Sequence, residues 1–184
     1  MISKRSAFLL YCLTATIFLA MTPARWWLQD KVGFQFIVPD LVLGMDTNTL
    51  GEFQSALAKP VGNSTGTAWF LALHTDSLDL LLPALTALSI AVFLLRNGAS
   101  LPAFNAMERR AKWLFCVIIG VPGMMVDYVE NYQVAKIITS SEAPTDRMAS
   151  MVTVLTTLKF SCLVFAALVC VTFLLATLRH KKNL

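Results

Sequence analysis

Four long stretches without charged residues dominate the pattern of apolar and polar positions along the chain. Residues 6–24 and 160–178 each form a stretch of 19 uncharged residues, and 80–95 and 113–126 form stretches of 16 and 14. A helix needs about 20 mostly apolar residues to cross the roughly 30 Å hydrocarbon core of a bilayer. The pattern therefore predicts an all-α membrane protein, a bundle of four transmembrane helices.

The four stretches and the segments between them define the expected elements. All 184 residues are assigned to one domain. The first helix is expected to be retained, because residues 20–22 (Ala-Met-Thr) make a poor signal-peptide cleavage site. The expected elements are helices at about 6–24, 69–95, 111–132 and 149–178, with exterior loops at 25–68 and 133–148.

The first exterior loop is long for a connection, so we expect it to have structure of its own. Residues 34–38 alternate briefly, as in an edge strand. Thr49 and Glu52 have the spacing of a capping box, which predicts a short helix with Phe53 and Ala56 on one face. We expect this segment to fold over the outer mouth of the bundle.

Composition and charge are consistent with a membrane protein and indicate its orientation. The chain is 57% hydrophobic and carries a net charge of +4. Nine of its 15 Lys and Arg residues lie before residue 6, between 96 and 112, or after 178, where Glu108 is the one acid. Loops rich in Lys and Arg remain in the cytoplasm. We therefore expect a multi-pass protein of the bacterial inner membrane with cytoplasmic N- and C-termini, and no nucleic-acid partner.

Ionisable residues interrupt three of the helices at a common depth. Lys112 and Asp127 are separated by 14 residues, about 21 Å of helix, which is too short to cross a bilayer. Asp127 is therefore drawn to the outer edge of the hydrocarbon. The same argument, counted from Arg96, places Asp79 near that edge, and Lys159 falls at the same level of the fourth helix.

Helical spacing directs these residues towards one another. Asp76 and Asp79 are i,i+3 on one face of the second helix, as Asp127 and Glu130 are on the third. Ionisable groups at this depth turn towards the bundle interior or a water-filled pocket. We expect an outward-facing polar layer with these ligand-binding candidates: Asp76, Asp79, Asp127, Glu130, Asn131 and Lys159.

The composition of the layer favours some chemistries over others. It could be an ion-paired network that fixes helix packing, or a site for a cationic ligand or lipid headgroup, and His74 or Lys136 could join it. Metal binding is disfavoured, because di-metal bundles use Glu-x-x-His pairs and His74 lies on a different face from Asp76. Ion transport is disfavoured because the cytoplasmic halves of the helices are almost entirely apolar. No catalytic residue, metal or cofactor is assigned.

Two short motifs carry a family resemblance. Residues 78–83 (LDLLLP) and 127–131 (DYVEN) resemble a group of uncharacterised bacterial four-helix integral membrane proteins. That group pairs D-x-x-x-P on helix two with D-x-x-E-N on helix three. The resemblance implies no established activity, and it points to five positions: Asp79, Pro83, Asp127, Glu130 and Asn131.

The sequence favours a non-enzymatic accessory or ligand-sensing component with an outward-facing acidic pocket. Its expected partners are the lipid bilayer, a cationic ligand or lipid headgroup, and another membrane protein or a second copy of the chain. One alternative is a small membrane enzyme acting on a lipid or lipid-linked substrate, with Asp127 or Glu130 as general acid or base. Another is a structural membrane protein whose acidic layer only fixes helix packing.

The charge pattern predicts that the C-terminus is cytoplasmic. A reporter fused after Leu184 should be active if it works only in the cytoplasm and silent if it works only in the periplasm. The reverse result would invert the predicted topology and move the acidic layer to the cytoplasmic side.

Overall fold

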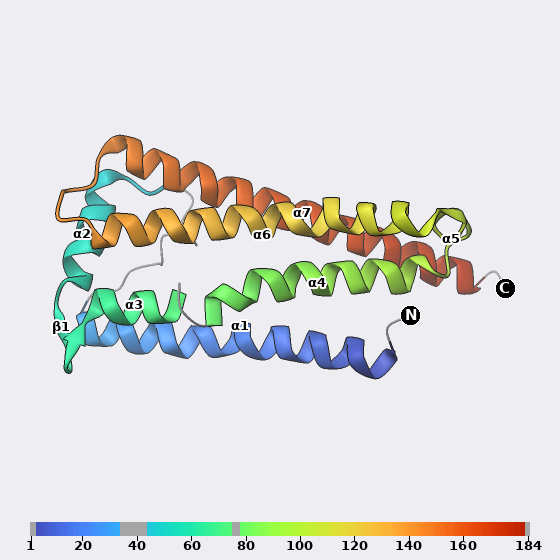
Figure 1. Ribbon diagram of the computed structural model, residues 1–184, viewed down its shortest axis with the longest axis horizontal. Coiled ribbons are helices and arrows are strands. Elements are labelled where there is room, and N and C mark those ends of the chain that lie inside the picture. Colours follow the sequence, from blue (N-terminus) through green and yellow to red (C-terminus); the bar gives the residue numbers. More distant parts are fainter. Residues whose placement is uncertain (1–2, 34–43, 75–77, 183–184) are drawn as a thin grey trace.

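The computed structural model (Figure 1) describes residues 3–33, 44–74 and 78–182. Among these residues, four segments are long and apolar enough to cross a membrane, which confirms the expected all-α architecture. These segments are α1 (Lys4–Val32), Gly66–Gly98 with its two helices α3 (Gly66–His74) and α4 (Leu78–Gly98), α6 (Arg109–Thr139), and most of α7 (Asp146–Lys182).

Helices α4, α6 and α7 form the centre of the bundle, and α1 lies at its edge. Helix α6 packs against both α4 and α7, whereas α1 packs mainly against α3 and α4 (Figure 1). Gly120 of α6 allows a close approach to α4, because a Cβ atom there would stand only 3.0 Å from the Ala87 carbonyl oxygen. A small residue at a helix crossing lets two backbones pack tightly.

All four long segments extend beyond the boundaries expected from the sequence, and the second runs from Gly66 to Gly98 rather than from 69 to 95. Helix α1 runs to Val32 rather than to residue 24, and Gly33 ends it with a left-handed φ of 65°. Helix α6 runs to Thr139, and α7 starts at Asp146. The predicted exterior loops therefore begin or end with helical turns, because other parts of the chain pack against those turns.

A short helix and a small hairpin cover the end of the bundle that holds these extra turns. The helix is α2 (Thr47–Leu57), and the hairpin pairs β1 (Pro60–Val61) with β2 (Ser64–Thr65). The expected helix is present, but its N-cap is Asp46 rather than Thr49. The Thr49 amide donates to the Asp46 carboxylate, and this bond lowers the pKa of that group. The predicted extended segment 34–38 lies outside the described residues.

We call this cover the exterior cap, after the side of the membrane that the charge pattern predicts for it, and it satisfies backbone groups at the ends of two long helices. Lys59 donates to the Val32 carbonyl at the end of α1, 2.9 Å away. Gln54 of α2 donates to the Ile137 carbonyl near the end of α6. The Thr47 hydroxyl donates to the Asp146 carboxylate in the first turn of α7. Helix ends leave unpaired backbone groups, so the bonds from Lys59 and Gln54 support the added turns of α1 and α6.

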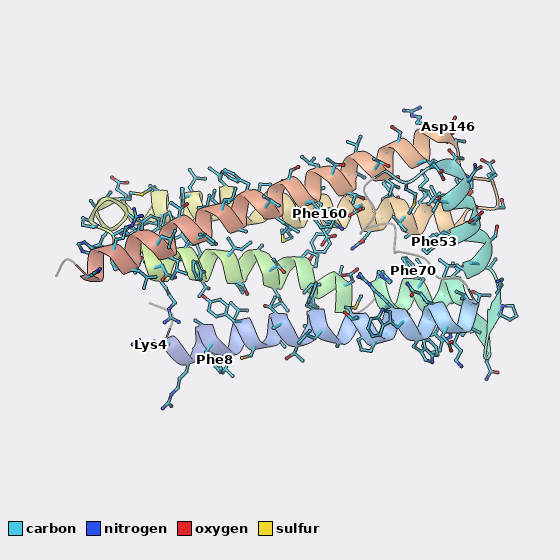
Figure 2. All side chains as sticks on the ribbon, turned by 180° about the vertical axis from the view of Figure 1, so that it is seen from behind. Lys4, Phe8, Phe53, Phe70, Asp146 and Phe160 are labelled. Carbon is cyan, nitrogen blue, oxygen red and sulfur yellow. The ribbon has the colours of Figure 1, made fainter. Side chains whose placement is uncertain are left out.

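Two apolar cores lie at opposite ends of the bundle. The exterior core includes Leu28, Phe53 and Phe70. The other core centres on Leu94 and Cys116, and Phe104 of the short helix α5 (Pro102–Ala106) packs nearby. In Figure 2, Phe53 and Phe70 lie near one end, Lys4 and Phe8 near the other, and Phe160 between them. The residues between the two cores form the site described below.

Two glycines of the exterior cap provide a matched test of its packing. A Cβ atom at Gly66 would stand 2.8 Å from the Leu57 carbonyl oxygen, whereas Gly51 has no neighbour closer than 4.0 Å. We expect Gly66→Ala to lower the free energy of unfolding by about 1–3 kcal/mol through overpacking. Gly51→Ala should raise it by up to about 1 kcal/mol, because alanine favours helix. Denaturant unfolding in detergent measures both, and equal effects would contradict this packing.

Candidate functional site

Lys159 joins α7 to α6 through two carboxylates. Its Nζ atom lies 2.5 Å from Glu130 and 3.2 Å from Asp127, one helical turn apart on α6. The Lys159 and Glu130 side chains are almost completely buried, and Asp127 is about one-fifth exposed. A buried cation needs paired charges to offset its loss of hydration. This cluster therefore fixes the register of α6 against α7.

Glu130 is enclosed by protein on every side. Its exposed fraction is zero, and Thr156 of α7 donates to its second carboxylate oxygen. Thr156 also bonds the Val152 carbonyl within its own helix, which fixes the hydroxyl. No ligand can therefore reach Glu130 without opening the bundle, so its contacts are those of a structural residue.

Arg25 makes the corresponding connection from α1. Its guanidinium lies 3.6 Å from the Asp79 carboxylate of α4, and its Nε donates to His74 Nε2 of α3 at 3.2 Å. His74 Nδ1 lies 3.0 Å from the Phe70 carbonyl. This arrangement fits a neutral histidine that donates from Nδ1 and accepts at Nε2. One residue thus ties α1 to both α3 and α4.

The two charged clusters face a common cavity of about 550 Å³ that all four long helices line. Arg25, Asp79, Asp127 and Lys159 contribute to its wall at one end. The wall between this end and Tyr11 is mainly apolar, with some hydroxyl groups. The larger apolar residues are Phe18, Met21, Leu82, Pro83, Met124, Phe160 and Leu163, and the hydroxyl groups are those of Tyr11, Thr14, Thr22, Thr86 and Ser89.

Pro83 lies inside α4 and interrupts the hydrogen bonding of that helix. Proline has no N–H to donate to the carbonyl four residues earlier, which is that of Asp79. One residue further on, the Tyr128 hydroxyl of α6 donates to the Leu80 carbonyl at 2.7 Å. The interrupted turn of α4 therefore gains a bond from the neighbouring helix beside the cavity.

The structure divides the sequence-predicted site residues into groups. Asp79, Asp127 and Lys159 line the cavity, as expected, and Glu130 contacts Lys159 but does not line the cavity.

The other predicted residues lie away from the cavity or outside the described part of the chain. Asn131 is half-buried and does not line the cavity, and the exposed Lys136 is not part of the layer. His74 joins it through Arg25. Asp76 lies outside the described residues. Whether the layer binds a ligand stays a prediction.

Arg25 is the principal residue that sequence reasoning missed. It was assigned to the exterior loop, because the first uncharged stretch ends at residue 24. A usable signal was present in the sequence. Met21, Leu28 and Val32, all buried in α1, share a helical face with Arg25 at spacings of three or four residues. That pattern indicates a helix that continues past the arginine and turns it inward.

Arg25 also changes the charge of the site. Three carboxylates, those of Asp79, Asp127 and Glu130, face two cations, Arg25 and Lys159. The sequence places four carboxylates, including that of Asp76, in one layer with Lys159, which alone cannot balance their charge. Among the described residues the layer is therefore close to neutral, and each cation has a carboxylate from another helix.

No protein-family model matches this chain, and no curated protein or solved structure is significantly similar to it.

The Lys159 cluster predicts strong coupling between two mutations. Lys159→Met and Glu130→Gln should each lower the free energy of unfolding in detergent by about 3–5 kcal/mol, because each leaves a buried group without its partner. The double variant should recover part of that loss. Lys136→Met is the matched control, because Lys136 is exposed on α6, and its effect should be small. Additive losses would mean that the two residues do not act as a pair.

Proposed function

We propose that this protein is a multi-pass membrane protein that binds a small amphipathic molecule in the cavity between its four long helices. In this role it is an accessory or ligand-sensing component rather than an enzyme. The observation that supports the proposal most directly is the composition of the cavity wall, which has ion pairs at one end and apolar side chains beyond them. Ligand pockets in proteins are mostly apolar with a few well-placed polar groups.

The dimensions of the cavity favour a ligand with an extended apolar part. Tyr11 and Arg25, both on α1, mark its two ends. They are 14 residues apart, which is about 21 Å along a helix. That is roughly two-thirds of the hydrocarbon thickness of a bilayer. An acyl or alkyl chain that lies along this wall would keep its head beside the charged residues.

Exposed residues on the rim favour entry from the membrane. Ala15, Phe18 and Thr22 line the cavity from α1, and all three are exposed on the surface of the protein. An exposed apolar rim on a membrane-length helix faces lipid. A molecule dissolved in the bilayer could therefore reach the cavity without crossing the aqueous phase.

The charged residues at the Arg25 end of the cavity favour a ligand head group that carries an ammonium. Asp127 keeps about one-fifth of its surface exposed, and it lines the cavity. An ammonium in the cavity would add a positive charge beside the partly exposed Asp127 carboxylate. A primary amine offers that charge together with hydrogen-bond donors. On the predicted orientation, this end faces the outer leaflet of the bacterial inner membrane.

The buried Glu130 limits the two alternative functions. A lipid-modifying enzyme would have to use Asp127 as its general acid or base, because Glu130 is fully buried behind the cavity wall. A purely structural layer would account for Glu130, Thr156 and Lys159. It would not account for the cavity next to Asp127, and for that reason we favour ligand binding.

A cavity-filling variant tests the proposal without altering the charged residues. Ala15→Trp places a large side chain in the cavity, and Ala20→Trp is the matched control on an exposed position of α1 that does not line it. Native mass spectrometry of protein purified from native membranes should show a bound amphipathic amine. The signal should persist in Ala20→Trp and be lost in Ala15→Trp.

A thermal-shift series tests the head group. A long-chain primary amine should raise Tm, while the matching long-chain alcohol and a short-chain amine should have little effect. Asp127→Asn should weaken the response to the amine by about tenfold, because it removes one charge-assisted hydrogen bond. Equal responses to the amine and the alcohol would rule out recognition of the ammonium. Unchanged binding in Ala15→Trp would place the ligand elsewhere.

A further inference from the structure

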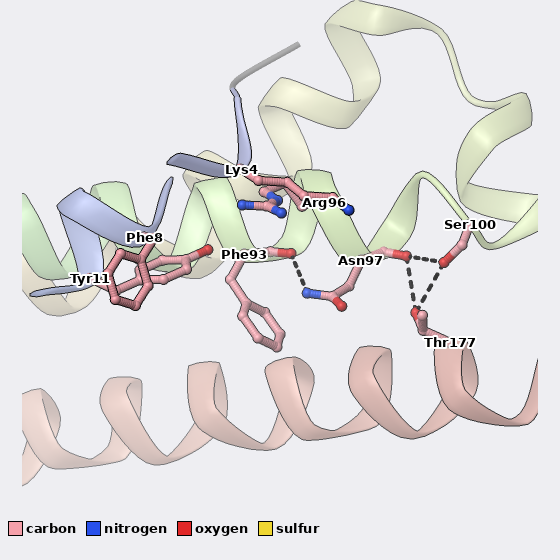
Figure 3. Close-up of a pocket in the computed structure, with 8 residues that line it drawn as sticks. All are labelled: Lys4, Phe8, Tyr11, Phe93, Arg96, Asn97, Ser100 and Thr177. Carbon is pink, nitrogen blue, oxygen red and sulfur yellow. Dashed lines mark hydrogen bonds between the residues drawn. The ribbon is translucent and has the colours of Figure 1, made fainter. Parts of the chain in front are cut away.

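A second cavity, of about 610 Å³, lies at the opposite end of the bundle from the exterior cap. It is lined by the start of α1, the end of α4 and one residue of α7 (Figure 3). The charge pattern of the sequence explains the basic residues at this end only by their effect on membrane orientation. Their placement around a cavity is a separate property, which the proposed function does not use.

Both charged residues of this cavity are cations. Lys4 reaches it from the first turn of α1 and Arg96 from the last turns of α4. Among the described residues, neither side chain forms an ion pair with a carboxylate. Lys4 also lies where the dipole of α1 is positive, and that field favours a bound anion. Two cations from different helices therefore line one cavity, and no carboxylate of the described residues lines it with them.

The wall behind the cations is held in place by hydrogen bonds. Ser100 and Thr177 both donate to the Asn97 carbonyl, at 2.7 Å and 3.0 Å (Figure 3). The Asn97 amide group donates to the Phe93 carbonyl at 2.9 Å. These bonds join α4, the turn after it and α7. These bonds therefore hold this wall of the cavity in a fixed position.

The remaining wall is aromatic. Phe8, Tyr11 and Phe93 line the cavity beside the cations, and Phe8 is 66% exposed. An aromatic, lipid-facing wall next to paired cations suits a molecule with an anionic head and an apolar tail. A free phosphate ion would contact the cations and leave this wall unused.

We infer that this cavity binds the phosphate group of an anionic phospholipid, with Lys4 and Arg96 on the phosphate oxygens. An acyl chain of the lipid lies against Phe8, Tyr11 and Phe93. The chemistry rests on two observed features, a pair of cations that line one cavity and an adjacent aromatic wall. Arginine and lysine are the side chains that proteins use for phosphate, arginine through a planar fork of donors. The inference does not rest on the amphipathic amine proposed for the other cavity, although both cavities have Tyr11 in their walls.

Lipid titration of the full chain in non-ionic detergent tests the inference. Dioleoyl phosphatidylglycerol should raise Tm in a saturable way, whereas the zwitterionic dioleoyl phosphatidylcholine should not. Arg96→Gln and Lys4→Gln should each raise the half-saturating concentration of phosphatidylglycerol by about fivefold. Lys4 is exposed, so its variant should fold even if Arg96→Gln does not.

The matched control is Arg5→Gln, which removes a neighbouring exposed charge that does not line the cavity. Its response to phosphatidylglycerol should equal that of the parent. Equal weakening by Arg5→Gln and Lys4→Gln would show diffuse surface attraction and overturn the inference. Inorganic phosphate forms a further arm of the experiment. A Tm rise from inorganic phosphate as large as that from the lipid would assign the site to free phosphate and exclude a role for the aromatic wall.

Discussion

The contact between Lys159 and its two carboxylates is the constraint on which the rest of the bundle depends. An ammonium group inside an apolar helix bundle is stable only when opposite charges surround it. Lys159 therefore fixes α7 against α6 at the level of Glu130 and Asp127. Helix α6 in turn fixes α4, because Gly120 lets the two backbones approach closely. Lys159 and Gly120 thereby fix the positions of α4, α6 and α7 relative to one another.

The remaining long helix is placed differently, and this difference creates the cavity. Helix α1 packs mainly against α3 and α4. An ion pair joins its Arg25 to Asp79 in the bundle interior. The apolar cores at the two ends are filled with side chains, while the stretch between them keeps about 550 Å³ of space. Helix association in lipid depends on packing and polar contacts, so a peripheral helix with few such contacts can leave room for a ligand.

The two ends of the bundle meet their surroundings in opposite ways. At the exterior end, α2 covers the bundle, and Lys59 and Gln54 donate to carbonyls near the ends of α1 and α6. At the other end, the helices terminate in basic residues, and Lys4 and Arg96 border an open cavity. One end is closed by protein, whereas the other presents positive charge where a phospholipid headgroup would lie.

The fold class, the number of membrane-length helices and the meeting of Asp127 with Lys159 could be predicted from the sequence. Uncharged length and helical spacing are local properties, so they can be read from the chain. The other features depend on how the helices pack together. Tertiary structure extended α1 to Val32, because Lys59 and the exterior core support the added turns. That extension turned Arg25 from a loop residue into the partner of Asp79. Tertiary packing also made Glu130 fully buried and left Asp127 partly exposed. The exposure of a side chain depends on which neighbouring helix covers it, and the sequence of one helix does not specify this.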